Sequence, residues 1–200
     1  IHASPPCRGA SRLPKMGANK QLAGMDIDID WLIRRLKEAE ASCQARGQPL
    51  MWTIENVPES EKLVTEQVQK RARLCGTMMG HRVFRHRVFY CNFDASDDLP
   101  HSHEGKWVGA RGVHYSDLDD AERYGHIKNP NMYGVYSQPS PERGTLDDWH
   151  GAMGFPPNTF SVKGMVGALP ISYGRLMVAQ MTAHYLHRRY GCPVFKPEEM

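Results

Sequence analysis

The strand–helix–strand pattern of residues 1–57 constrains the fold of this chain more than any other feature. Residues 1–4 are typical of the end of a strand, which the next two residues terminate because proline donates no hydrogen bond to a sheet. A helix is predicted after Asp28 or Asp30, and the apolar stretch PLMWTIENV, residues 49–57, predicts a buried strand. Two strands joined by a crossover helix form a βαβ unit, which implies a parallel sheet.

The helix of this unit is indicated by apolar side chains at helical spacing and by the glycine that follows them. These side chains are Leu32, Leu36, Ala39 and Cys43, and Gly47 is expected to end the helix. We therefore expect an α/β fold with a doubly wound, mostly parallel sheet. In open sheets of this kind, ligands bind outside the carboxyl ends of the strands.

Polar residues follow both predicted strands of the unit. Cys7 comes after the first strand, and Glu55 and Asn56 end the second. Because the carboxyl ends of parallel strands meet at one edge, we expect Cys7 and Glu55 to lie at the same edge.

The whole chain divides into three parts by pattern. Residues 1–91 hold the α/β core, including the segment HRVFRHRVFYCNF, whose alternating basic and apolar residues favour a strand with one polar face. Residues 92–150 have little periodicity and are expected to form a loop-rich insertion. Residues 151–200 return to the core with a helix over residues 175–190, whose predicted apolar stripe is Leu176, Ala179, Ala183, Leu186 and Tyr190.

Composition excludes few functions. A formal net charge of +3 permits a nucleic-acid partner without indicating one. The sequence contains neither an apolar run long enough to cross a bilayer nor a leader pattern, so no membrane partner is expected. The 5 cysteines form no C-x-x-C pair, which argues against a disulfide framework and against a zinc site, and the four besides Cys7 are expected to be small buried side chains.

Four segments of the chain resemble, in order, motifs of the DNA (cytosine-5) methyltransferases. SPPCRGAS resembles the Pro-Cys motif of that family, IENV its Glu-Asn-Val motif, and VFRHR its paired-arginine strand. GALPISYGRLMVAQM is similar to the segment that leads into the last helix of the family, and RLCGTMMGHRVFRHRVF is similar to small phage and actinobacterial members. Each motif is weakly specific by itself, but four in register are strong.

The resemblance implies a class I methyltransferase-like fold that is incomplete at its N-terminus. It implies transfer of a methyl group from S-adenosyl-L-methionine to carbon 5 of cytosine in double-stranded DNA, with the target base flipped out of the helix. Residues 92–150 would then act as a small target-recognition region, reading a few base pairs. A cytoplasmic location, in a bacterial cell or a phage-infected host, and a role such as restriction-modification follow as expectations.

The resemblance also implies four catalytic residues. Cys7 would be the thiolate that adds to carbon 6 of the base, with its pKa lowered by neighbouring arginines. Glu55 would hold the ring nitrogen and the exocyclic amine and donate a proton. Arg87 would bind the carbonyl oxygen of the base, and Arg85 would orient Glu55 and its strand.

Further residues are implied to bind the DNA and the methyl donor. The DNA-binding residues are Arg8, Ser11, Arg12 and Asn56, of which Ser11 would contact a phosphate and Asn56 would also brace the turn beside the two prolines. The donor-binding residues are Pro5, Ala168 and Leu169, and no residue is assigned to a metal.

The chain departs from the family pattern in several places. Arg8 stands where the family usually has Gln, Val83 stands at the first position of its Gln-x-Arg-x-Arg pattern, and Gly167 stands at the usual Asn of the last motif. The glycine-rich loop that binds the donor has no counterpart in this sequence. We therefore expect that Ile1 lies within a strand, that this loop lies upstream of it, and that an upstream chain or segment is a partner.

Two other functions stay open at this point. A DNA-binding remnant without catalysis would explain the missing donor loop, and a thiol hydrolase would pair Cys7 with one of the 10 histidines. Each motif also has a structural explanation, since cysteines are usually packing residues and alternating arginines usually form a solvated strand face. His101 and His103 lack recognisable zinc spacing.

Overall fold

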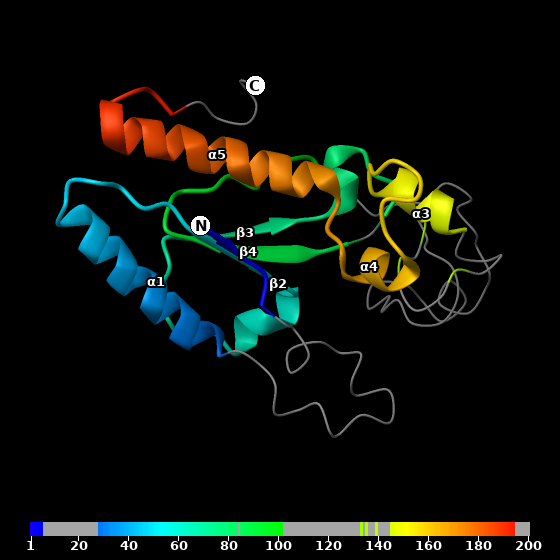
Figure 1. Cartoon of the computed structure of the whole chain (residues 1–200), viewed down its shortest axis with the longest axis horizontal. Coiled ribbons are helices and arrows are strands. Elements are labelled where there is room, and N and C mark those ends of the chain that lie inside the picture. Colours follow the sequence, from blue (N-terminus) through cyan, green and yellow to red (C-terminus); the bar gives the residue numbers. More distant parts are fainter. Residues whose placement is uncertain are drawn as a thin grey trace. The chain divides into compact units, whose positions relative to one another are not determined.

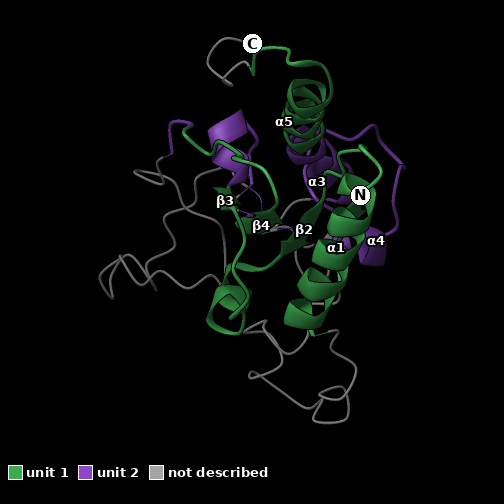
Figure 2. Ribbon diagram, turned by 90° about the vertical axis from the view of Figure 1, so that its left-hand side faces the viewer, with its two compact units in different colours: residues 1–74, 86–98, 176–200 green, residues 75–85, 99–175 purple. Residues whose placement is uncertain are grey.

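A computed structural model of the chain describes residues 1–5, 28–83, 85–101, 133, 135, 139 and 145–194. The chain divides into two compact units (Figure 2). Unit 1 comprises residues 1–74, 86–98 and 176–200, and unit 2 comprises residues 75–85 and 99–175. Each unit has its own cluster of buried hydrophobic side chains.

Unit 1 contains a sheet of four strands in the order β1-β2-β4-β3. These strands are β1 (His2–Ala3), β2 (Thr53–Asn56), β3 (Lys70–Leu74) and β4 (Arg87–Cys91). β1 and β2 are parallel, whereas β4 is antiparallel to both β2 and β3. The expected doubly wound, mostly parallel sheet is therefore wrong for the described part of the chain, where the sheet is mixed and mostly antiparallel.

The connections explain the difference. Parallel neighbours need a long crossover, which α1 (Ile29–Gln44) supplies between β1 and β2. The chain between β3 and β4 carries only the short 3₁₀ helix η4 (Gly76–Met79) in place of an α-helical crossover, so the two strands pair antiparallel. β3 was not predicted from the sequence, although its buried Ala72 and Leu74 do alternate with arginines.

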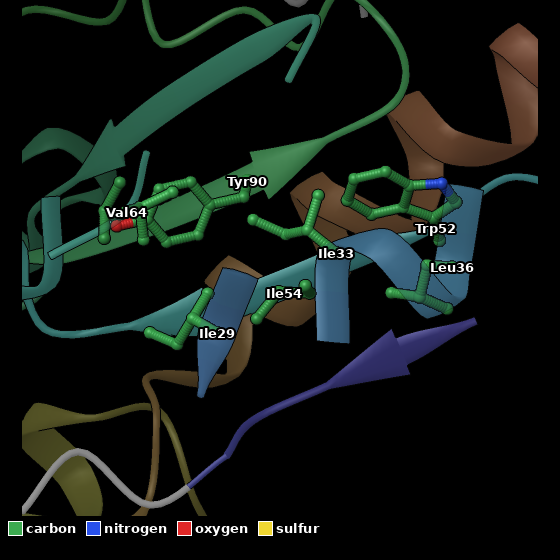
Figure 3. Packing of buried hydrophobic residues seen from close by; sticks show 8 residues of the cluster. Ile29, Ile33, Leu36, Trp52, Ile54, Val64 and Tyr90 are labelled. Atoms are coloured by element: carbon green, nitrogen blue, oxygen red, sulfur yellow. The ribbon is translucent and has the colours of Figure 1, made fainter. Parts of the chain in front are cut away.

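The predicted helix and second strand of the βαβ unit are confirmed. Asp28 caps α1 by accepting a hydrogen bond from the Asp30 backbone N–H at 2.9 Å, and Gly47, at φ 68°, lies in the turn that follows the helix. The apolar face of α1 packs against the sheet, where the side chains gather around Ile54 and Tyr90 (Figure 3). The buried cluster is Ile29, Ile33, Leu36, Trp52, Ile54, Val64, Val88 and Tyr90.

Helix α5 (Ile171–Tyr190) begins four residues earlier than predicted and passes from unit 2 into unit 1 at Leu176. Within unit 1 it lies on the other side of the sheet from α1 (Figure 1). The Gln180 side chain accepts a hydrogen bond from Ser96 N at 2.6 Å and donates one to Ser96 O at 3.1 Å. The predicted stripe is wrong, because Met177 and Gln180 are the buried residues of this face. Leu176, Ala179 and Ala183 are only half-buried, and Leu186 and Tyr190 are exposed.

None of the described helices combines the length and the apolar character that a membrane-spanning segment needs.

Unit 2 is organised around two short helices, α3 (Leu146–Ala152) and α4 (Val162–Gly167). Its buried cluster is Val83, Val135, Trp149, Met153 and Met165. Thr145 caps α3 by accepting from Asp148 N, and the Asp148 carboxylate accepts in return from Thr145 N at 2.8 Å. Much of the predicted loop-rich region 92–150 lies outside the described residues, so its role in recognition stays a prediction.

Asp30 fixes the start of α1 to the segment that precedes β3. Its buried carboxylate accepts hydrogen bonds from Thr65 N at 3.0 Å, from Thr65 Oγ1 at 2.5 Å and from Glu66 N at 3.0 Å. Burial by itself would raise the pKa of Asp30, but these hydrogen bonds, with the charge of Arg34, outweigh it and lower the pKa below 3.8. The ionised carboxylate therefore stabilises the folded state above its unfolded pKa, and this stabilisation is lost as the pH falls through the folded value.

We predict that Asp30→Asn lowers the free energy of unfolding by about 2 kcal/mol at pH 7, because hydrogen bonds to a charged acceptor are lost. Urea unfolding followed by the tryptophan fluorescence of the chain, to which buried Trp52 contributes, measures the change. The difference from wild type should disappear as the pH falls below 3.8. Glu38→Gln, at an exposed position of α1, is the matched control and should change little. A difference that is the same at pH 7 and below pH 3.8 would contradict this account.

Candidate functional site

Glu55 and Arg87 lie on one face of the sheet because of the register between their strands. Glu55 pairs with Phe89 across the antiparallel β2–β4 ladder, and Arg87 is two residues before Phe89 in β4. Side chains two residues apart in a strand share a face, as do directly paired residues, so the carboxylate and the guanidinium lie on the same side.

These two side chains form an ion pair. Arg87 Nε lies 2.7 Å from Glu55 Oε1, and the exposed fractions of the side chains are 17% for Arg87 and 7% for Glu55. Arg87 Nη1 also donates to the backbone carbonyl of His86 at 2.7 Å, which holds the guanidinium at the start of β4. The Ser4 hydroxyl donates to Glu55 Oε2, so each oxygen of the carboxylate has a partner.

Asn56, the next residue of β2, makes its contacts on the face of the sheet opposite to that of Glu55. Its Nδ2 donates to the carbonyl of Pro5 at 3.3 Å, and its Oδ1 accepts from Val57 N at 2.9 Å. Each of the last two residues of β2 thus binds the segment that follows β1. Glu55 contacts Ser4, and Asn56 contacts Pro5. In the sequence this segment runs directly into Pro6 and Cys7.

Two imidazoles near the ion pair favour their neutral forms. Burial lowers the pKa of His2, and the negative charge of Glu55 opposes that shift. Burial also lowers the pKa of His86, and the positive charge of Arg87 adds to it, while Glu59 opposes both. Neither ring therefore adds a positive charge to the site at neutral pH.

The structure brings together some of the predicted site residues. Pro5, Glu55, Asn56 and Arg87 meet at the carboxyl end of β2 in unit 1. The other predicted residues of this region, namely Cys7, Arg8, Ser11 and Arg12, lie outside the described part of the chain.

Three further predicted residues belong to unit 2. Arg85 is buried, and its Nη1 donates to Val135 O at 3.4 Å, while its carbonyl accepts a hydrogen bond from the Tyr173 hydroxyl. Ala168 is the C-cap of α4, and Leu169 follows it; both are half-buried. The ion pair with Glu55 is made by Arg87. The orienting role that the resemblance implies for Arg85 stays a prediction.

Sequence reasoning missed Ser4 and His2. Both lie in or next to β1, and alternation along a strand places them on the same face as Glu55, given that His2 pairs with Thr53. The register of β1 against β2 was the signal that would have identified them, but it depends on a pairing that no local pattern reports.

The other cysteines differ in their surroundings. Cys75 and Cys91 are buried, and burial raises the pKa of the Cys91 thiol to about 12, so this thiol stays protonated at neutral pH. Cys43 is half-buried and Cys192 is exposed, contrary to the expectation that both would be buried packing residues.

The site can bind a group that presents hydrogen-bond donors beside an acceptor. A carboxylate has about four lone-pair sites, and Glu55 accepts only the two hydrogen bonds that involve Ser4 and Arg87 among the described residues. A guanidinium carries five N–H donors, two of which Arg87 directs to Glu55 and to His86. An acceptor and a donor therefore stand side by side with hydrogen-bonding capacity left for a ligand.

Comparison with models of known protein families gives no match to this chain, and a search of curated proteins finds no matching relative.

We predict that the Glu55–Arg87 pair contributes more to stability than an exposed pair of similar length. Arg87→Met should lower the free energy of unfolding by about 3 kcal/mol, because it leaves a buried carboxylate without its cation. A double-mutant cycle with Glu55→Gln should give a coupling energy of about 2 kcal/mol in urea unfolding.

The matched control is the Arg35–Glu38 pair on α1, at 2.5 Å but with both side chains 61% exposed. The same cycle there should give less than about 0.5 kcal/mol. Equal coupling energies for the two pairs would show that burial does not strengthen the Glu55–Arg87 contact.

Proposed function

We propose that this chain is a DNA (cytosine-5) methyltransferase, or the catalytic part of one. The observation that carries the proposal is the buried pair of Glu55 and Arg87 beside Pro5, at the strand end that leads in the sequence to Cys7. The four motifs in register suggest the reaction, and the geometry of Glu55 and Arg87 supports the proposal that they bind the base.

The paired side chains are complementary to one edge of cytosine. That edge carries a carbonyl oxygen next to a ring nitrogen and an exocyclic amine. Glu55 would accept from the amine and hold the ring nitrogen. Arg87 would donate to the carbonyl oxygen through an N–H that is not directed to Glu55 or His86. Enzymes that act on a base read a flipped base through hydrogen bonds of this kind.

Cys7 would supply the covalent step. Its thiolate adds to carbon 6 of cytosine, and Glu55, which takes up a proton from solvent before this step, gives that proton to the ring nitrogen. The ring thereby becomes an enamine that is nucleophilic at carbon 5. Carbon 5 then takes the methyl group, and S-adenosyl-L-homocysteine is the leaving group. Water accepts the proton from carbon 5 as the carbon–sulfur bond breaks, and the ring nitrogen returns its proton to Glu55. The base is then methylated, and the thiolate is free again.

S-adenosyl-L-methionine is the methyl donor in this proposal. The resemblance places Pro5, Ala168 and Leu169 against it, and these residues offer apolar surface and backbone groups rather than charge. The Pro5 carbonyl already accepts a hydrogen bond from Asn56, so Pro5 would contact the donor through its ring.

Double-stranded DNA with an extruded cytosine is the proposed partner. Arg8, Ser11 and Arg12 would contact it beside the flipped base, and residues 92–150 would read the target sequence. Asn56 acts on the DNA indirectly, since its side chain binds Pro5.

We expect the chain to form a covalent adduct with duplex DNA that contains 5-fluorocytosine when S-adenosyl-L-methionine is present. Fluorine at carbon 5 prevents the final elimination, so a working enzyme stays attached to the base through Cys7. A denaturing gel and mass spectrometry measure the adduct. Cys7→Ser should remove it without weakening DNA binding, whereas Cys192→Ser, which changes an exposed thiol elsewhere in the chain, should leave it intact.

Three outcomes separate the alternatives. An adduct that needs Cys7 supports the proposal, and one that forms only with a donor-binding segment supplied in trans identifies the chain as a catalytic part. Steeply salt-dependent DNA binding without any adduct in either arm would contradict the proposal and favour a non-catalytic binding remnant.

A further inference from the structure

We propose that Ser4 is a positioning residue, which orients the Glu55 carboxylate for the incoming base. This inference rests on the proposed function for its catalytic consequence, but the contact itself does not depend on it. Ser4 donates its hydroxyl hydrogen to Glu55 Oε2, while Arg87 Nε lies 2.7 Å from Oε1. Two donors, one directly after β1 and the other in β4, thus bind the two oxygens of one carboxylate.

A contact on each oxygen restricts the carboxylate more than one contact would. The terminal torsion of a glutamate side chain is broad and roughly two-fold, so a single partner leaves the plane of the carboxylate poorly defined. With Ser4 on Oε2 and Arg87 on Oε1, rotation about this torsion would break both hydrogen bonds at once. Ser4 therefore keeps Oε1 next to the donor groups of Arg87.

The position of Ser4 in the chain couples this orientation to the nucleophile. Ser4 follows β1 directly, and Cys7 is three residues further in the sequence. The neighbouring hydrogen bond, from Asn56 to the Pro5 carbonyl, fixes the backbone of the same segment. The hydrogen bond from Ser4 to Glu55 therefore connects the segment that leads to the thiol with the carboxylate that would hold the base.

A simpler explanation is that Ser4 only fastens β1 to β2, as Asn56 does. The two explanations differ in what the loss of the hydroxyl changes. Fastening affects stability alone, whereas positioning affects the Glu55–Arg87 contact and the rate of the chemical step at saturating DNA.

The first measurement is independent of catalysis. Exchange of the Arg87 Nε hydrogen with solvent, followed by NMR, reports how firmly Glu55 Oε1 holds that donor. Ser4→Ala should speed this exchange by about tenfold, because one of the two contacts that fix the carboxylate is lost. Ser4→Thr retains a hydroxyl and should restore slow exchange. Ser42→Ala is the control, since it removes a serine hydroxyl that accepts from Arg46 at 3.0 Å on the exposed surface of α1, and it should leave exchange at Arg87 unchanged.

The second measurement is the single-turnover rate of the 5-fluorocytosine adduct. Ser4→Ala should lower this rate by about tenfold at saturating DNA and leave the dissociation constant for DNA nearly unchanged, with Ser4→Thr again close to wild type. Unchanged exchange at Arg87 in Ser4→Ala would overturn the inference whatever the protein does to DNA. Faster exchange with a normal adduct rate would also overturn it and leave Ser4 as a fastening residue.

The failure of the proposed function looks different. If wild type forms no adduct under any condition, while Ser4→Ala speeds exchange and Ser4→Thr restores it, the methyltransferase proposal fails. The orientation of Glu55 by Ser4 is then supported, and only its link to cytosine is overturned.

Discussion

The ion pair between Glu55 and Arg87 joins β2 to β4 at the strand end where the polar residues of unit 1 meet. A carboxylate in this buried position would be costly without a cation, and a guanidinium there would be costly without an acceptor. The pair therefore depends on β4 lying beside β2 in one particular register. A shift of that register by one residue would move Arg87 to the other face and leave both charges unpaired.

The antiparallel placement of β4 gives the site its composition. Because β4 runs against β2, its first residue, Arg87, lies near the carboxyl end of β2, next to Glu55. In a purely parallel sheet the start of a neighbouring strand would lie at the other edge. The same edge receives Ser4 and Pro5 from the end of β1, which runs parallel to β2. One reversed strand thus brings a cation to an edge that parallel strands supply with polar side chains.

Local patterns predicted the elements better than their pairing. The cap at Asp28 and the apolar spacing of α1 are local, and the structure bears out the helix they predict. The prediction of a mostly parallel sheet was wrong because the direction of β4 depends on the short connection after β3. In addition, the two arginines of β3 obscured the alternating pattern of that strand.

The prediction of the site also succeeded where local patterns were sufficient and failed where strand pairing mattered. Glu55 and Asn56 were identified from their place at the end of an apolar run, but no local pattern reported that Arg87 is the ion-pair partner of Glu55, because that contact depends on the register between β2 and β4. Ser4 was missed because its contact depends on a pairing across 51 residues of sequence.

The most direct test of the account is the analysis of nucleosides from DNA incubated with the protein and S-adenosyl-L-methionine that carries a deuterated methyl group. The account predicts 5-methylcytosine that retains the three deuterium atoms, and its loss when Glu55 is replaced by glutamine. Transfer of the label to another base, or to no base with the donor-binding segment also present, would contradict the central claim that the Glu55–Arg87 pair serves a cytosine methyltransferase.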